Sequence, residues 1–191
     1  ATWLLLGIIV DTNNFVYRTS STTFEIAAKL QKYGADMNAV KTYLKEDHQE
    51  KKIRSTFVNN MEVHRNRVAI AYSEENVHHE RATLAKVSDE LISISGIELG
   101  ITVGYIGEKE VGLSARSLGN INCQMLMEKM GGGGHLNNAA AQRKNQTVKE
   151  VIAVLKETID KYLEEEENMK VILIKDYKKL GKKNDIIEVA A

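Results

Sequence analysis

The sequence predicts an α/β fold, a mixed sheet with packed helices that is preceded by a helical segment. Between residues 68 and 163, short apolar runs with strand character alternate with apolar patterns of helical period. Residues 1–56 carry helix caps and helical periodicity instead. The 191 residues, 43% hydrophobic and 27% charged, suffice for one ordinary domain with parts of others.

Charge and cysteine content narrow the class of protein. Lys and Arg together number 26, as do Asp and Glu, so the formal net charge is zero. This balance argues against a protein that wraps a polyanion, but it allows a local basic pocket. The single cysteine, Cys123, excludes a disulfide framework and favours a reducing compartment. Its helical apolar surroundings predict a small buried hydrophobe.

Asp11 follows the only long apolar run, Leu4–Val10, which is too short to span a bilayer. The end of a buried element is a place where α/β enzymes often hold a metal ligand. The residue types of Asp11–Asn13 are also common in turns and helix caps, and from these residues alone a cap is the favoured interpretation.

The first block predicts two helices. Thr22–Glu25 has the form of a capping box that opens a helix through Tyr33, with Gly34 as its stop. Asp36 is expected to cap a second helix. The charged residues 45–54 are interpreted as a solvated helix face or a linker.

The following block predicts alternating strands and helices. Strands are expected at 68–72, 96–106, 110–114 and 136–142, and helices at 79–92, 120–130 and from the capping box Thr147–Glu150 onward. The tail predicts strands at 169–175 and 186–189 around a basic turn at 180–185. A two-stranded hairpin of this size is marginally stable by itself.

Four consecutive glycines and a histidine come between a predicted helix and a predicted strand: Gly131, Gly132, Gly133, Gly134 and His135. A nest of free backbone N–H groups beside an imidazole would suit a phosphate ester. One glycine would equally serve as the C-cap of the helix, so both interpretations remain open. The other histidines are interpreted as surface residues: His48, His64, His78 and His79.

Two arginines have phosphate-binding surroundings. Arg116 lies in the segment Ser114–Ser117 at a strand end, where it could hold a phosphate bidentately. Arg18, followed by Thr19 and Ser20, has the same composition. A surface arginine without a ligand is the alternative for both.

The ordered motifs together resemble the DHH-family phosphoesterases, with the closest likeness to the C-terminal half of membrane-anchored bacterial cyclic-di-AMP phosphodiesterases. The matching segments are residues 7–15 (GIIVDTNNF), 18–36, 53–58 (IRSTFV), 112–121 (GLSARSLGNI) and 127–142 (MEKMGGGGHLNNAAAQ). Residues 169–190 resemble the start of the ninth large-subunit ribosomal protein. The resemblance implies a remnant of the DHH catalytic domain at 1–56, a DHH-associated substrate-binding domain at 57–166, and a ribosomal-protein-like hairpin at 167–191.

The resemblance also implies roles for individual residues. Asp11 matches the last aspartate ligand of a centre of two Mn2+ ions, and is therefore a catalytic residue of the family. The loop 131–135 matches the segment that holds the nucleotide, while Ser114, Arg116 and Asn138 would line the same cleft and Arg18 would lie near it. The implied reaction is hydrolysis of cyclic di-AMP to linear pApA, in which two metal ions activate a water molecule.

The chain departs from the family in its metal ligands. The upstream Asp-x-Asp and Asp-His-His motifs do not occur, and Asp47-His48 lies on the wrong side of Asp11. One aspartate cannot hold two divalent cations, so this chain alone is expected to be an inactive, soluble part of a signalling enzyme. The parent would act at the cytoplasmic face of the bacterial membrane, without membrane contact from this part.

Two alternative functions remain open. One is a phosphoesterase of the same superfamily that acts on nanoRNA or other short oligonucleotides. The other is a non-catalytic module that binds nucleotides or RNA. Homodimerisation is left open, and ribosomal RNA would be a partner only if the tail is functional.

Overall fold

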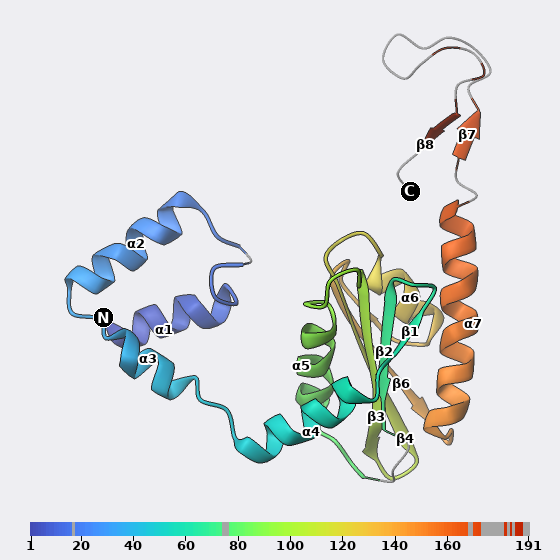
Figure 1. The fold of residues 1–191 in the computed structure, drawn as a ribbon, viewed down its shortest axis with the longest axis horizontal. Coiled ribbons are helices and arrows are strands. Elements are labelled where there is room, and N and C mark those ends of the chain that lie inside the picture. Colours follow the sequence, from blue (N-terminus) through green and yellow to red (C-terminus); the bar gives the residue numbers. More distant parts are fainter. Residues whose placement is uncertain are drawn as a thin grey trace. The chain divides into compact units, whose positions relative to one another are not determined.

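The structure is a computed structural model that describes residues 1–16, 18–73, 77–167, 170–172, 182, 184 and 186–188. The chain divides after Lys51 into two units, Ala1–Lys51 and Lys52–Ala191. The first is helical and the second is built on a sheet (Figure 1). The expected boundaries at residues 56 and 166 stay predictions.

The first unit contains α1 (Thr2–Asp11), α2 (Ser21–Lys32) and α3 (Met37–Tyr43). Its small core consists of Leu5, Ile9 and Val40. The apolar run that was expected to be a buried element forms most of α1, in which only Leu5 and Ile9 are buried. Asp11 is therefore the last residue of a largely exposed helix, and is itself exposed.

The caps of this unit confirm one prediction and correct another. Asp36 caps α3, because its Oδ1 accepts a hydrogen bond from the Asn38 N–H at 2.8 Å. The capping box of α2 is formed by Ser20 and Thr23, two residues earlier than expected. The Thr23 hydroxyl accepts from the Ser20 N–H at 3.1 Å, so the box needs no Glu25.

The second unit is a mixed six-stranded sheet in the order β1-β2-β3-β4-β6-β5, as the fold class predicts. The parallel pair β2–β3 is joined through α5, and the other neighbouring strands are antiparallel. The strands are β1 (Glu62–His64), β2 (Val68–Tyr72), β3 (Leu99–Gly107), β4 (Glu110–Ser117), β5 (Gly133–Gly134) and β6 (Asn138–Lys144). The helices are α4 (His48–Asn59), which contains the point of division, α5 (Arg81–Leu91), α6 (Cys123–Lys129) and α7 (Val148–Glu167).

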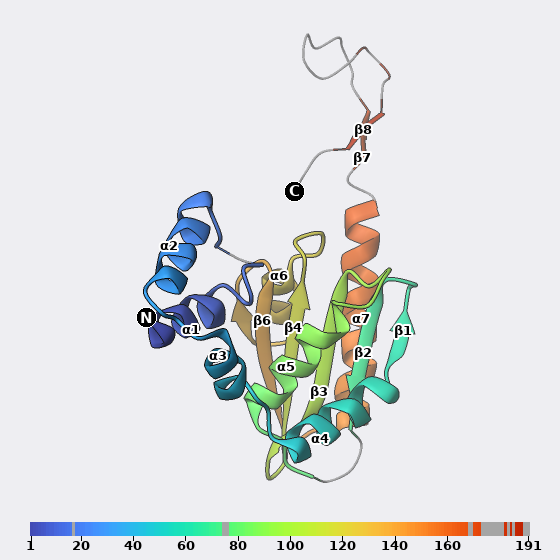
Figure 2. The ribbon, with the colours of Figure 1, turned by 60° about the vertical axis from the view of Figure 1, so that its left-hand side comes forward.

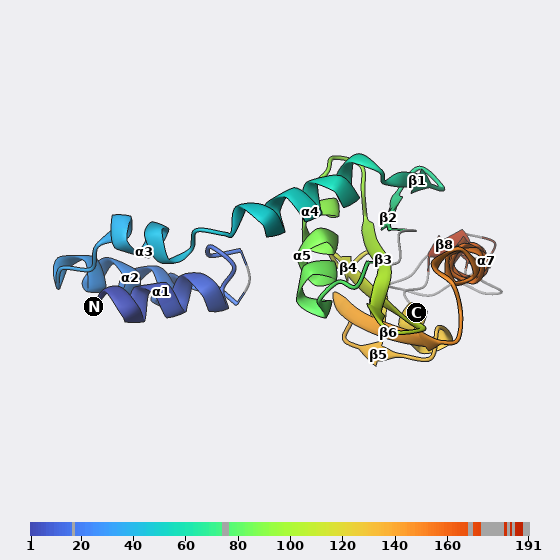
Figure 3. The ribbon, with the colours of Figure 1, turned by 90° about the horizontal axis from the view of Figure 1, so that it is seen from below.

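Helices cover both faces of the sheet. The main core lies between the sheet and the helices α6 and α7, and a smaller core lies under α5 and α4 on the opposite face. Figure 3 shows α5 and α7 on opposite sides of β3. Along β4, Val111, Leu113 and Ala115 face the main core, so Gly112, Ser114 and Arg116 face the side of α5.

Helix α5 is held close to β3 and β4 (Figure 2). A Cβ atom on Gly100 would lie 2.7 Å from the Leu91 Cβ, so glycine permits this approach. The buried Ser88 hydroxyl lies 2.8 Å from the Thr102 hydroxyl and donates to the Ser114 carbonyl at 2.9 Å. The helix is thereby fixed over the middle of the sheet, while β6 presents exposed residues on the same face.

The tail forms a second, two-stranded sheet from β7 (Lys170–Ile172) and β8 (Ile186–Glu188), paired antiparallel as predicted. Most of the expected basic turn, including Gly181 and Lys183, lies outside the described residues. Among the helices that the structure describes, none is long and apolar enough to cross a membrane.

Candidate functional site

The glycine loop begins as the C-cap of α6. Gly131 has φ of +82°, its N–H donates to the Glu128 carbonyl, and the Gly132 N–H donates to the Met127 carbonyl at 2.8 Å. These two bonds form a Schellman motif, in which glycine is favoured at the residue with positive φ. The C-cap interpretation is therefore correct for Gly131.

The remaining glycines differ in the space that is available for a side chain. A Cβ on Gly132 would lie 2.0 Å from the Ala140 carbonyl oxygen, and one on Gly134 would lie 2.5 Å from the Ala139 Cα. Both residues must lack a side chain because the loop runs against β6, with which β5 pairs. Gly133 has nothing within 4 Å of its Cβ position, so its open side faces a cavity.

The expectation of a nest of free N–H groups is wrong for three residues of this loop. The N–H groups of Gly131 and Gly132 cap α6, and the His135 N–H donates to the Asn138 carbonyl at 2.7 Å. Helix capping and the turn into β6 use these donors, which leaves the open side of Gly133 and the His135 ring to face a ligand.

A cavity of about 760 Å³ lies over this face of the second unit. Its floor is formed by β4 and β6, one wall by α5 with Ile106, and the other wall by the glycine loop. The cavity brings together eight residues that the sequence predicts for a site: Ser114, Arg116, Gly131, Gly132, Gly133, Gly134, His135 and Asn138.

Arg116 is the best-anchored cation of the cavity. Its Nε donates to Asp89 Oδ1 at 3.0 Å and its Nη1 donates to the Ala115 carbonyl at 3.0 Å. Within the described residues its Nη2 makes no hydrogen bond, so a ligand oxygen can bind there. Burial raises the pKa of Asp89, and the Arg116 guanidinium opposes that rise. The bonds to Asp89 and Ala115 fix the orientation of the guanidinium, and with it the direction of Nη2.

Three polar residues of the cavity were missed in the sequence: Arg81, Gln142 and Lys144. Gln142 and Lys144 share a face of β6 with Asn138 and Ala140, because alternate residues of a strand point to the same side. Period-two alternation over 138–144 was the available signal. Arg81 begins α5, and its position beside β4 depends on tertiary packing that no local pattern indicates.

Asp11 and Arg18 belong to the first unit. The Arg18 Nη2 lies 3.1 Å from Asp11 Oδ1, and both side chains are exposed. Among the described residues, no three His, Cys, Asp or Glu side chains are grouped so that they could hold a metal ion. This donor set does not fit a centre of two metal ions.

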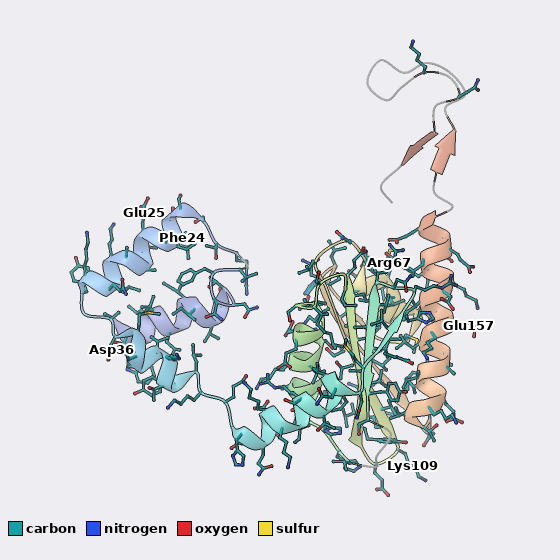
Figure 4. All side chains as sticks on the ribbon, in the orientation of Figure 1. Phe24, Glu25, Asp36, Arg67, Lys109 and Glu157 are labelled. Atoms are coloured by element: carbon teal, nitrogen blue, oxygen red, sulfur yellow. The ribbon has the colours of Figure 1, made fainter. Side chains whose placement is uncertain are left out.

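Two histidines that were interpreted as surface residues are half-buried. The His64 Nε2 lies 2.8 Å from Asp160 Oδ1, where β1 meets α7. His79 packs against the edge of Phe57, with ring centroids 4.9 Å apart. Beside His64, Arg67 pairs with Glu98 and Glu166, and lies towards α7 (Figure 4). These contacts hold sheet and helices together and lie away from the cavity.

Cys123, at the start of α6, is buried as the sequence predicts. The residue is fully buried in the main core, and burial raises the pKa of its thiol. The protonated thiol is therefore favoured, as for a small apolar side chain.

The fold and this cavity define an α/β domain in which a cavity lined by Arg81, Arg116 and Lys144 lies beside a glycine–histidine loop. A model of the DHHA1 domain matches residues 65–165, which is more than half of the chain. The chain therefore belongs to the DHHA1 domain family. A model of the N-terminal domain of ribosomal protein L9 matches residues 169–191.

Several curated proteins are similar to this chain. A membrane protein–large ribosomal subunit bL9 fusion protein from Aster yellows witches'-broom phytoplasma is 39% identical over 190 residues, covering 99% of this chain and 22% of the relative. The cyclic-di-AMP phosphodiesterase PdeA of Listeria monocytogenes is 43% identical over 162 residues, covering 85% of this chain and 25% of PdeA. The chain thus spans about a quarter of the length of these relatives.

A solved structure supports the fold. An exopolyphosphatase-related protein from Bacteroides fragilis superimposes with a TM-score of 0.71 at 21% identity, covering 81% of this chain and 48% of that protein. The membership of the chain in a family of phosphodiesterase relatives, and the resemblance of its tail to ribosomal protein L9, are both as predicted.

Proposed function

We propose that this chain is the substrate-binding portion of a phosphodiesterase that hydrolyses cyclic di-AMP to linear pApA. The observation that carries this proposal is the convergence of Arg116, Asn138 and the loop 131–135 on one cavity. The similarity to relatives named as cyclic-di-AMP phosphodiesterases supports the substrate.

The cavity residues would bind and orient the dinucleotide. The Arg116 Nη2 would donate to a phosphate oxygen, and the cations of Arg81 and Lys144 would add positive potential to the cavity. Asn138 and His135 would donate hydrogen bonds at the same end as Arg116. The open side of Gly133 allows the ligand to approach the backbone closely.

The chemical step would require groups beyond those described here. Asp11 is proposed as one ligand of two Mn2+ ions, which when bound would supply an activated water molecule. Since the described donors do not fit such a centre, the chain by itself is proposed to bind without hydrolysing. In the parent, this portion is proposed to lie at the cytoplasmic face of a membrane. The name of the phytoplasma relative, a membrane protein fusion, supports the membrane association.

Isothermal titration calorimetry of the 191-residue chain with cyclic di-AMP tests the proposal. Arg116→Gln and His135→Ala should each weaken binding about tenfold or more, because each removes a donor to the ligand. Arg67→Gln is the matched control, since Arg67 is also ion-paired but lies outside the cavity. The same titration with Arg18→Ala measures whether the first unit contributes.

Three outcomes would contradict the proposal. They are absence of cyclic di-AMP binding, equal losses in Arg116→Gln and Arg67→Gln, or much tighter binding of linear RNA oligomers. The last would favour the oligonucleotide phosphoesterase or the RNA-binding module. A homodimer, and ribosomal RNA as a partner of the tail, remain predictions.

A further inference from the structure

Gln142 occupies a position in the cavity that phosphate binding alone does not explain. It lies on β6 directly opposite Gly112 of β4, on the face that carries Asn138 and Lys144. Its side chain is exposed and lines the cavity. Within the described part of the chain its amide makes no hydrogen bond, so both its donor and its acceptor can serve a ligand.

An apolar surface lies beside this amide. Gly112 has no side chain, and a Cβ there would lie 2.7 Å from Ile106 Cγ2 and 3.2 Å from Leu84 Cδ1. The methyl groups of Ile106 and Leu84 therefore lie against Gly112, next to Gln142. Leu84 is fully buried, so the half-buried Ile106 provides the apolar surface that faces the cavity, with Leu84 packed behind it. A flat, weakly hydrated ring can pack on such a surface while its edge meets the amide.

The spacing along the strand suits a nucleotide. Gln142 is four residues beyond Asn138, which corresponds to about 13 Å at the usual rise of a strand. Asn138 pairs in register with Arg116 and lies beside His135, at the end of the cavity with the phosphate-binding groups. A phosphate at that end would allow its base to extend along the floor to Gln142.

We infer that Gln142 reads the adenine base and so sets the base preference of the cavity. The inference rests on the proposed function and deepens it. Along its N6–N7 edge, adenine offers a donor and an acceptor, which match the two groups of a carboxamide. Guanine offers two acceptors along the same edge, so the carboxamide can satisfy only one of them, whereas lysine can donate to both.

Calorimetry with cyclic di-AMP and cyclic di-GMP tests this role. Wild type should prefer cyclic di-AMP by about tenfold or more, as expected for a bidentate pair. Gln142→Leu should bring the two affinities close together, and Gln142→Lys should favour cyclic di-GMP. Gln124→Leu and Gln124→Lys are matched controls, because Gln124 is an exposed glutamine of α6 outside the cavity. These controls should retain the wild-type preference.

The outcomes separate the two proposals. If wild type binds neither dinucleotide, the proposed function fails and this inference fails with it. If wild type prefers cyclic di-AMP and Gln142→Leu retains the full preference, Gln142 does not read the base although the proposed function stands. The ratio of the two affinities is the deciding measurement, since a general loss of folding or of charge changes both affinities together. Circular dichroism melts of both variants verify that they fold.

Discussion

At the scale of single residues, Gly132 and Gly133 are neighbours with opposite tolerance for a side chain. Gly132→Ala should reduce the free energy of unfolding by about 1–3 kcal/mol or more, because its Cβ would overlap the Ala140 carbonyl. Gly133→Ala should remain within about 0.5 kcal/mol of wild type, because nothing lies within 4 Å of the added methyl group. Urea denaturation of both variants measures the difference.

The same pair distinguishes a structural loop from a ligand-binding one. Gly133→Ala should weaken cyclic di-AMP binding while leaving the unfolding midpoint unchanged, since the methyl group would enter the cavity. Unchanged affinity in Gly133→Ala would show that the ligand does not approach this part of the loop. Equal unfolding energies for the two variants would contradict the close packing of Gly132 on β6.

The residues of the site could be predicted where a local pattern marked them, or where the family resemblance implied them, as for Asn138. Four glycines before His135 indicated a loop with a special backbone, but the reason for each glycine depends on contacts with α6 and β6. The alternation over 138–144 places Gln142 on one face of a strand, but that this residue lies opposite Gly112 depends on the pairing of β6 with β4. Register between strands distant in sequence is decided by tertiary packing.

At the scale of elements, the start of α7 is fixed by a reciprocal capping box. The Thr147 N–H donates to Glu150 Oε2 at 2.7 Å, and the Glu150 N–H donates to the Thr147 hydroxyl at 3.2 Å. The pKa of Glu150 is lowered mainly by the bond from the Thr147 N–H, and further by the Thr147 hydroxyl, which donates to the same Oε2 at 2.9 Å. A capping box is thus confirmed where the sequence predicts one.

Thr147→Ala should lower the thermal midpoint at neutral pH by about 2–4 °C through loss of this cap. Because the folded-state pKa of Glu150 is lowered, its contribution is present above the unfolded-state pKa and is lost as the pH falls through the folded-state pKa. The variant keeps the Thr147 N–H and loses only the hydroxyl, which donates to the Glu150 carboxylate. The part of the difference that comes from this hydroxyl bond should therefore shrink below about pH 4. Melting curves from pH 3 to pH 7 measure it.

Glu157→Ala provides the control for this experiment. Glu157 lies on the same helix (Figure 4) and pairs with Lys161 on the exposed surface. Glu157→Ala should therefore change the thermal midpoint by less than Thr147→Ala does. A loss of stability in Thr147→Ala that is the same at pH 3 and pH 7 would show that the bond from the Thr147 hydroxyl to the Glu150 carboxylate does not contribute.

Elements were predictable in proportion to their length and period. β2 was predicted with its observed bounds, and α5 within two residues, because apolar residues recur there regularly. β1 and β5, with three and two residues, have no period to detect. The α2 cap was misplaced because adjacent Ser and Thr residues offer several equivalent boxes.

At the scale of the whole molecule, the cavity lies entirely within the second unit, whereas Asp11 belongs to the first. The dialysed 191-residue chain should therefore retain far less than one Mn2+ per molecule. It should also leave cyclic di-AMP intact when Mn2+ is added, because the described donors form no metal-binding group. Metal analysis by mass spectrometry and chromatography of the nucleotide measure both quantities.

A full-length cyclic-di-AMP phosphodiesterase such as PdeA serves as the positive control for product formation. Stoichiometric manganese, or release of pApA by the chain alone, would overturn the proposal that it only binds. At this scale the α/β class was predictable, since alternating patterns over a hundred residues permit few architectures.

The packing of the glycine loop has a kinetic consequence. Gly131, Gly132 and Gly134 are fixed by contacts that the protein makes with itself, so the conformational entropy of the loop is lost during folding. A ligand then meets a preorganised surface, and association should show a single fast phase without a slow ordering step. Differences in affinity among variants of the cavity should accordingly appear in the dissociation rate and in the residence time of the nucleotide.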